Sequence, residues 1–156
     1  MKKILIIEDD KIKIERLSGF FKNDKIQIEE SFQKGVSQLR NNITSYDFLI
    51  LDMTIPLWEK GGNDLGGNYE QFGGEKVLRE MKRRNLKLPT ILFTMFDVFP
   101  TKNGVITFKE IDATFSEKFK EFYVGAVLFN TEEDNWKNDL RNLIFKIISV
   151  RQKYRI

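Results

Sequence analysis

Acidic residues follow two apolar runs of the chain, and they are the residues best suited to chemistry. The run 4–7 is followed at once by Glu8 and Asp9, and the run 48–51 is followed by Asp52. Carboxylates held within several ångströms of one another repel strongly where the dielectric constant is low. A divalent hard cation with oxygen ligands relieves that repulsion, and Mg²⁺ fits such a ligand set.

The residue types that are missing exclude several kinds of site. The chain has no cysteine and no histidine. Disulfides, thiolate metal sites, a Ser-His-Asp triad, histidine-ligated zinc and a phosphohistidine on this chain are therefore excluded. A metal ion must be held by oxygen, which favours magnesium or calcium.

A hydroxyl completes the set, because the apolar run 90–93 is followed by Thr94. That hydroxyl can donate to a phosphoryl oxygen, and magnesium neutralises a phosphoryl group in transfer. Glu8, Asp9, Asp52 and Thr94 together predict a phosphorylation site. Taken singly, each has a plainer alternative: an acid that caps a helix, an aspartate in a turn or a threonine in a strand.

Short apolar runs alternate with amphipathic stretches five times along the chain. Continuous runs of this kind are typical of parallel strands that are covered on both faces. The pattern predicts an α/β fold, a doubly wound five-stranded parallel sheet with helices on both faces. Ligands of such sheets bind beyond the carboxyl ends of the strands, which is where the acids lie. The expected strands are 4–7, 26–28, 48–51, 90–93 and 124–129.

Two stretches interrupt the alternation. Residues 57–73 hold five of the ten glycines and show no apolar period, so we expect a loop. Residues 97–106 are expected to be irregular, with Pro100 and Gly104 as breakers. No repeat or linker indicates a second domain, so we expect a single domain over 1–156, with inserts near 57–73 and 95–123.

Charge and hydropathy limit the partners. The net charge of +3 is too small to indicate nucleic acid as a partner. The apolar runs are much shorter than the roughly 20 residues of a membrane span, so no membrane association is expected. The N-terminus shows no signal-peptide pattern, and we therefore expect a cytoplasmic location.

Several of these motifs also occur together in one known family. They are the segments 3–10 (KILIIEDD), 48–56 (FLILDMTIP), 74–82 (GEKVLREMK) and 88–94 (LPTILFT), with the pair 125–126 (GA). The chain resembles the response-regulator receiver domains of two-component signalling, which have a flavodoxin-like fold. The resemblance covers most of residues 1–96 and, more loosely, 124–150.

The resemblance implies a role for each site residue. Asp52 would be the phosphoacceptor and would receive its phosphoryl group from the phosphohistidine of a histidine kinase or phosphotransfer protein. Glu8, Asp9 and Asp52 would bind Mg²⁺ together with the backbone carbonyl of Thr54. Thr94 would contact the phosphoryl group as the switch hydroxyl. We expect no output domain after the receiver, and a stand-alone receiver of this kind would signal by protein–protein contact.

The chain departs from the family at the end of the fifth strand. Receiver domains normally have a lysine there, followed by proline, whereas the best-aligned residue here is Asn130. An amide brings no charge, and charge-assisted hydrogen bonds are roughly twice as strong as neutral ones. Met95 stands where the family has a small residue and would narrow the site. The family's switch aromatic would fall near Val127 or Phe129.

Two alternative functions remain open. A degenerate receiver would act as a phosphorylation-independent interaction module. A hydrolase of the haloacid dehalogenase class would also use a strand-end aspartate, but it needs a second acid two residues later, where this chain has Thr54. If the chain is a receiver, we expect no enzymatic activity other than magnesium-dependent self-phosphorylation and autodephosphorylation.

Overall fold

A parallel sheet forms the centre of the molecule. The computed structural model describes residues 1–59 and 69–153. Five strands lie in the order β2-β1-β3-β6-β9, and every neighbouring pair is parallel. They are β1 (Lys3–Ile7), β2 (Lys25–Glu29), β3 (Phe48–Leu51), β6 (Thr90–Thr94) and β9 (Tyr123–Leu128). The predicted doubly wound, flavodoxin-like sheet is confirmed.

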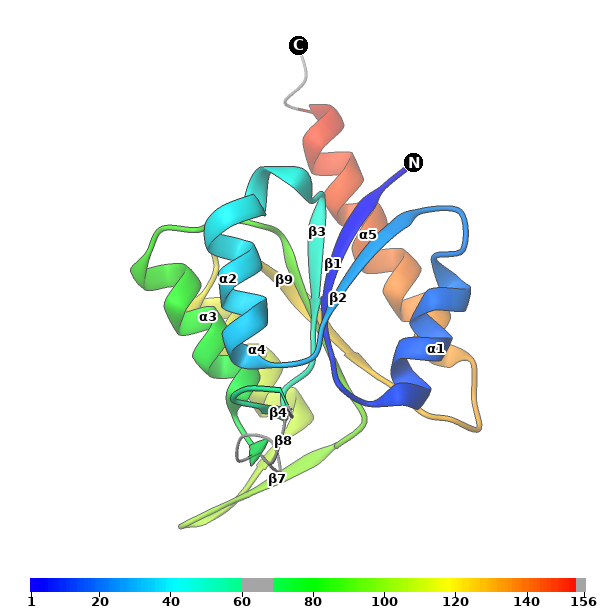
Figure 1. Cartoon of the computed structure of the whole chain (residues 1–156). Helices are drawn as coiled ribbons and strands as arrows, with labels where there is room; N and C mark the ends of the chain where they lie inside the picture. The colour runs from blue at the N-terminus through cyan, green and yellow to red at the C-terminus, as the bar shows by residue number, and fades with distance from the viewer. Residues whose placement is uncertain (60–68, 154–156) are drawn as a thin grey trace.

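Helices cover both faces of this sheet (Figure 1). One face packs against α1 and α5, and the other packs against α2, α3 and α4. A short 3-10 helix, η1 (Ile43–Ser45), precedes β3. The helices are α1 (Lys11–Phe20), α2 (Phe32–Asn42), α3 (Gly73–Arg83), α4 (Phe108–Lys118) and α5 (Asn135–Lys153).

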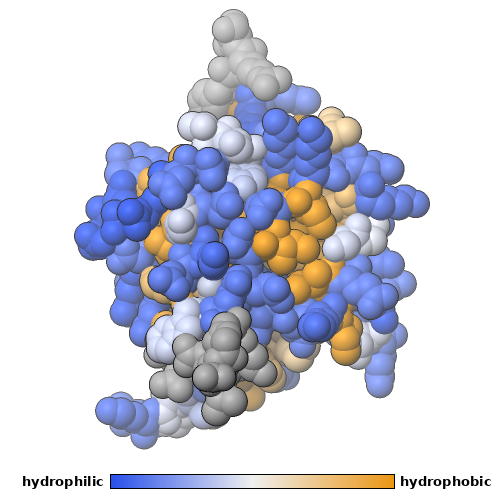
Figure 2. All heavy atoms as spheres, in the orientation of Figure 1, coloured by the Kyte–Doolittle hydropathy of each residue, from blue (hydrophilic) through white to orange (hydrophobic). Residues whose placement is uncertain are grey.

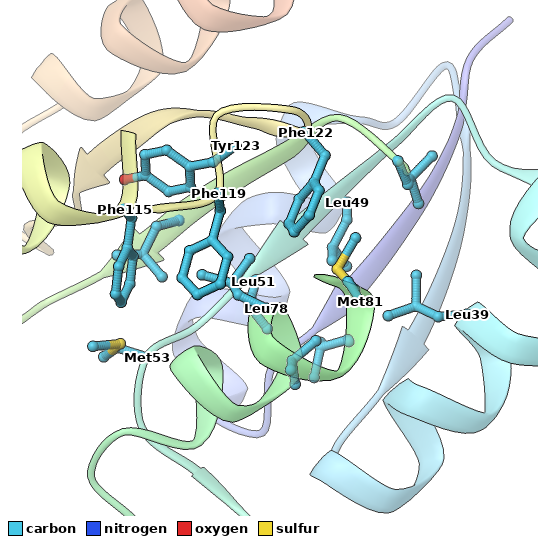
Figure 3. Close-up of a cluster of buried hydrophobic side chains, with 14 of the residues drawn as sticks. Leu39, Leu49, Leu51, Met53, Leu78, Met81, Phe115, Phe119, Phe122 and Tyr123 are labelled. Atoms are coloured by element: carbon cyan, nitrogen blue, oxygen red, sulfur yellow. The ribbon is translucent and has the colours of Figure 1, made fainter. Parts of the chain in front are cut away.

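The alternation of side chains along the central strands divides the core in two. Leu5 and Ile7 of β1 belong to the cluster under α2, α3 and α4, whereas Ile4 and Ile6 belong to the cluster under α1 and α5. Successive residues of a strand point to opposite faces, so a continuous apolar run is needed to fill both cores. Figure 3 shows the first cluster, in which aromatic rings from α4 and the start of β9 lie beside leucine and methionine side chains.

Polar side chains fix where three of the helices begin. Asp10, Ser31 and Thr107 are the N-cap residues of α1, α2 and α4, and each side chain accepts a hydrogen bond from a backbone N–H in the first turn. Of the acids after β1, Asp10 therefore has the capping role, which leaves Glu8 and Asp9 for other contacts.

The segment expected to be irregular forms a β-hairpin. β7 (Val98–Thr101) pairs antiparallel with β8 (Gly104–Thr107), and Gly104 has a φ of 132° in the turn. The expectation for 97–106 was wrong because tertiary packing stabilises this hairpin: Phe99 is buried against Phe72 and Phe96. Pro100 is tolerated since a two-stranded ribbon has free edges.

The expected loop 57–73 is only partly a loop. β5 (Tyr69–Glu70) pairs antiparallel with β4 (Ile55–Pro56), and α3 already begins at Gly73. Residues 60–68 of that expected loop lie outside the described residues. The two-residue strands were missed because pairing between distant segments leaves no periodic signal.

An ion pair joins the last helix to the sheet. Arg151 of α5 donates to the Asp47 carboxylate at 2.6 Å and to the Asp47 backbone carbonyl at 2.8 Å. The other Asp47 oxygen accepts from the Lys3 N–H at 2.8 Å. Asp47 thereby connects the start of β1, the start of β3 and the end of α5.

The surface in Figure 2 is mostly hydrophilic, with a hydrophobic area between the edge strand β2 and α1. Among the described helices, none has the length and apolar character that a membrane crossing requires.

Candidate functional site

The strand order brings the acidic residues together at one edge of the sheet. β1 and β3 are neighbours, and the Asp52 N–H donates to the Ile7 carbonyl at 3.0 Å. One carboxylate oxygen from each of Glu8, Asp9 and Asp52 lies within 4.8 Å of the others. The cluster expected from the sequence is thus present, and its oxygens are arranged so that they can bind a metal ion.

A lysine from α1 lies inside this cluster. Lys13 Nζ is 2.9 Å from Glu8 Oε2 and 2.8 Å from Asp52 Oδ2. The side chain of Lys13 is 2% exposed, and Glu8 and Asp52 are also buried. A buried ammonium is stable only when opposite charges compensate for the lost hydration, and the two carboxylates do so here.

Sequence reasoning missed Lys13, although a signal was present. Lys13 precedes Leu17 by four residues, and residues at that spacing share one face of a helix. Leu17 is fully buried, so the face that carries it points toward the sheet. A lysine on that face, next to an acidic strand end, is a candidate for a buried ion pair.

Hydrogen bonds fix the first turn of α1 around this ion pair. Asp10 Oδ1 accepts from the Lys13 N–H at 3.0 Å, and Glu8 Oε1 accepts from the Asp10 N–H at 3.0 Å. Asp52 Oδ1 accepts from the N–H of Met53 at 2.8 Å. Glu8 and Asp52 therefore each have one oxygen that accepts a backbone hydrogen bond and another that pairs with Lys13.

Burial dominates the electrostatics of the three charged side chains. Burial and the neighbouring Asp52 charge raise the pKa of Glu8 to about 9, against the opposing effect of Lys13. Burial also raises the pKa of Asp52, and Lys13 and the Met53 N–H oppose it. Burial alone would lower the pKa of Lys13, but the charges of Asp52 and Glu8 outweigh it and raise that pKa. Lys13 is therefore a cation, and a bound divalent ion would favour the ionised carboxylates.

Asp52 lines a cavity of about 380 Å³ at the carboxyl edge of the sheet. The cavity gives a small anion access to the Asp52 carboxylate, and Met95 and Phe96 form part of its wall. The described residues that line it are Asp9, Asp10, Lys13, Asp52, Thr54, Met95 and Phe96.

The two threonines of the sequence analysis have different surroundings. Thr94 ends β6, is fully buried, and its Oγ1 accepts from the Phe96 N–H at 3.3 Å. It is absent from the described lining of the Asp52 cavity. Thr54 does line that cavity, and its hydroxyl donates to the Gln71 backbone carbonyl at 3.0 Å.

Asn130 lies at the end of β9 but away from this cavity. It lines a separate cavity with Met95 and Asp97, and its Oδ1 accepts from the Glu132 N–H at 2.9 Å. The Asn130 side chain thus stabilises the turn after β9. The two candidate positions for a switch aromatic, Val127 and Phe129, are both buried.

Solved structures share this arrangement of strands and helices. A response-regulator receiver domain protein from Clostridium thermocellum is 18% identical, with a TM-score of 0.62 over 97% of this chain and 98% of that chain. A CheY-like receiver domain protein from Methanospirillum hungatei JF-1 is 15% identical, with a TM-score of 0.61 over 98% of each chain. The chain has the fold of a response-regulator receiver domain. The resemblance expected from the sequence motifs is thereby confirmed.

Two curated proteins are similar to the chain over most of its length. The Detocs response regulatory protein DtcB of Enterobacter cloacae is 28% identical over 144 residues, which are 87% of this chain and 94% of that protein. The uncharacterized protein y4jR of Sinorhizobium fredii is 28% identical over 146 residues, which are 90% of this chain and 95% of that protein. No protein-family model matches the chain.

Proposed function

We propose that this receiver accepts a phosphoryl group on Asp52 in a magnesium-dependent phosphorelay and signals by protein–protein contact. The observation that carries the proposal is the convergence of Glu8, Asp9 and Asp52 within 4.8 Å beside a cavity that reaches Asp52. The similarity to a response regulatory protein supports the signalling role.

The covalent step takes place between the Asp52 carboxylate and a phosphorylated donor. An Asp52 oxygen attacks phosphorus, the new O–P bond forms, and the P–N bond of the donor phosphohistidine breaks with its electron pair on the imidazole nitrogen. The donor is a histidine kinase or phosphotransfer protein. Glu8, Asp9 and the Thr54 backbone carbonyl would hold Mg²⁺ beside Asp52. When bound, the ion neutralises charge on the transferring group.

The test is phosphorylation by a small donor that needs no partner. Incubation with acetyl phosphate and Mg²⁺ is expected to add one phosphoryl group, seen by intact mass, and chelation of the metal should abolish the gain. Asp52→Asn should remove the gain because the amide is not a nucleophile. Asp97→Asn is the matched control, since Asp97 is exposed and lines the other cavity; it should be phosphorylated like the parent.

One observation favours a second function, that of a phosphorylation-independent interaction module. Lys13 already compensates the charges of Glu8 and Asp52, so the cluster is stable as a purely structural ion pair. This second function would be supported if the folded parent protein gains no phosphoryl group and binds neither Mg²⁺ nor beryllofluoride. Release of inorganic phosphate from simple phosphate esters would instead indicate a hydrolase.

A further inference from the structure

We propose that Lys13 is the cation that binds the phosphoryl group on Asp52. In the receiver domains that this chain resembles, a lysine at the end of the fifth strand supplies that charge. Here the charge would come from the opposite side of the site, from the first turn of α1. This inference rests on the proposed phosphorylation of Asp52.

The position of the ammonium is the first argument. Lys13 Nζ lies 2.8 Å from Asp52 Oδ2, and both residues line the same cavity. A phosphoryl group attached to that carboxylate would place its oxygens within reach of Nζ. Among the described residues that line the cavity, Lys13 is the one basic side chain.

The second argument is that the structure holds the ammonium in place. The Lys13 N–H is bound by the capping Asp10, and the side chain is almost fully buried. A charge that is fixed before reaction binds developing negative charge without reorganisation, and in a dry site it acts more strongly than in water. An exposed lysine would first have to lose its side-chain freedom and its hydration.

Among the described residues near the end of β9, none places a competing cation at the Asp52 cavity. Asn130 is neutral and its side-chain oxygen is engaged with the Glu132 N–H. Lys137, on the first turn of α5, pairs with Asp134 at 3.6 Å and lies over the Trp136 ring. Neither residue is among the described residues around the Asp52 cavity.

Charge balance allows Lys13 and a metal ion to act together. A bound divalent ion favours the ionised form of all three carboxylates. Three ionised carboxylates and one ammonium leave two negative charges, which that ion neutralises. Lys13 and Mg²⁺ would then share the oxygens of the phosphoryl group, while Glu8 and Asp9 remain ligands of the metal. If the Lys13 ammonium instead occupied the metal position, Lys13 would compete with Mg²⁺ and exclude it from the site.

The experiment compares Lys13→Met with Lys11→Met in the full chain. Lys11 lies on the same turn of α1 but is exposed, so its replacement removes the same charge without touching the site. We expect Lys13→Met to slow phosphorylation by acetyl phosphate and weaken beryllofluoride binding about ten-fold or more, because a charge-assisted hydrogen bond is lost. Magnesium alone, measured by calorimetry, should bind the variant at least as tightly as the parent. Lys11→Met should match the parent in all three measurements.

A second pair of variants covers the case in which Lys13→Met does not fold. Glu8→Gln with Lys13→Met removes both members of an ion pair and keeps the charge balance, and it is compared with Glu8→Gln alone at saturating Mg²⁺. A drop of about ten-fold or more between these two variants supports the inference. Equal rates of phosphorylation in either comparison overturn the inference. It is also overturned if Lys13→Met both binds Mg²⁺ more tightly and is phosphorylated faster than the parent. A parent that gains no phosphoryl group overturns the proposed function itself, whereas a phosphorylated parent with an equally active Lys13→Met overturns only the role of Lys13.

Discussion

Buried charged and polar residues of this protein depend on partners from other elements. Lys13 is compensated by two carboxylates from two different strand ends, so its charge depends on the pairing of β1 with β3. Tyr123 has a simpler pairing, in which its hydroxyl donates to Asp112 Oδ1 at 2.7 Å across α4 and β9. Burial, with the hydrogen bond and the charge of Asp112, raises the pKa of Tyr123 above its usual value.

The Tyr123 pairing predicts a loss of stability at alkaline pH. The folded chain resists ionisation of Tyr123, but the unfolded chain releases that proton near the usual pKa of about 10. The contribution of Tyr123 is therefore fully present below pH 10 or so and decreases as the pH rises further. Tyr123→Phe should be less stable than the parent by about 0.5–1.5 kcal/mol near neutral pH. Urea melts should show this deficit shrinking above a pH of about 10; a deficit independent of pH would contradict the prediction.

The start of α3 lies in close contact with the residues that follow β3. The Gly74 N–H donates to the Met53 carbonyl at 2.8 Å. A Cβ at Gly74 would collide with the Asp52 backbone carbonyl and lie 2.9 Å from the Met53 Cα. Backbone cannot give way as a flexible side chain can, so the absence of a side chain at Gly74 sets the distance between α3 and the residue proposed to accept phosphate.

Gly74→Ala should therefore destabilise the fold and disturb the Asp52 site. We expect a loss of about 1–3 kcal/mol in the free energy of unfolding, typical of overpacking, and slower phosphorylation of the folded protein. Gly19→Ala is the control, because a Cβ at Gly19 meets nothing within 4 Å. That helix position should gain about 0.4–1 kcal/mol from the reduced entropy of the unfolded chain. Urea melts measure both changes, and equal stability of the two variants would argue against the close contact.

At the scale of the whole molecule, hydrogen bonds connect the site to the β7–β8 hairpin. The Thr54 hydroxyl binds the Gln71 carbonyl, and Gln71 Nε2 donates to the Pro100 carbonyl at 2.6 Å. The hairpin and the residues before it expose apolar side chains, with Phe96 48%, Val98 47% and Val105 60% exposed. Phe96 lines the Asp52 cavity, and Phe96 and Val98 both line a neighbouring cavity together with Thr54, so this apolar surface begins at the site.

Phosphorylation should therefore change the backbone conformation of the β7–β8 hairpin more than that of β9. Because Asn130 at the end of β9 is neutral and lines a separate cavity, we expect beryllofluoride with Mg²⁺ to shift the backbone NMR signals of residues 95–107 and of the first turn of α1. Signals of β9 should change little. Gln71→Ala should reduce the hairpin response and leave the α1 response intact. Large changes along β9 and α5, with a quiet hairpin, would refute the prediction.

The sequence by itself determined the sheet and the acidic cluster. Continuous apolar runs identify strands that are buried on both faces, and parallel strands place their carboxyl ends at one edge, so Glu8, Asp9 and Asp52 had to converge. The positions of the strands followed from the apolar runs, since each of the five expected runs overlaps one strand of the observed sheet. These features depend on residues close together in the chain.

Only the tertiary structure decided what surrounds the cluster. Lys13 shares a helix face with the buried Leu17, but only the pairing of β1 with β3 supplies both of the carboxylates that make its burial possible. The hairpin forms because Phe99 packs against Phe72, and Asn130 aligns with a lysine of the family yet lines another cavity. Contacts between distant segments compensate buried charges and stabilise short strands, and such contacts leave no period in the sequence.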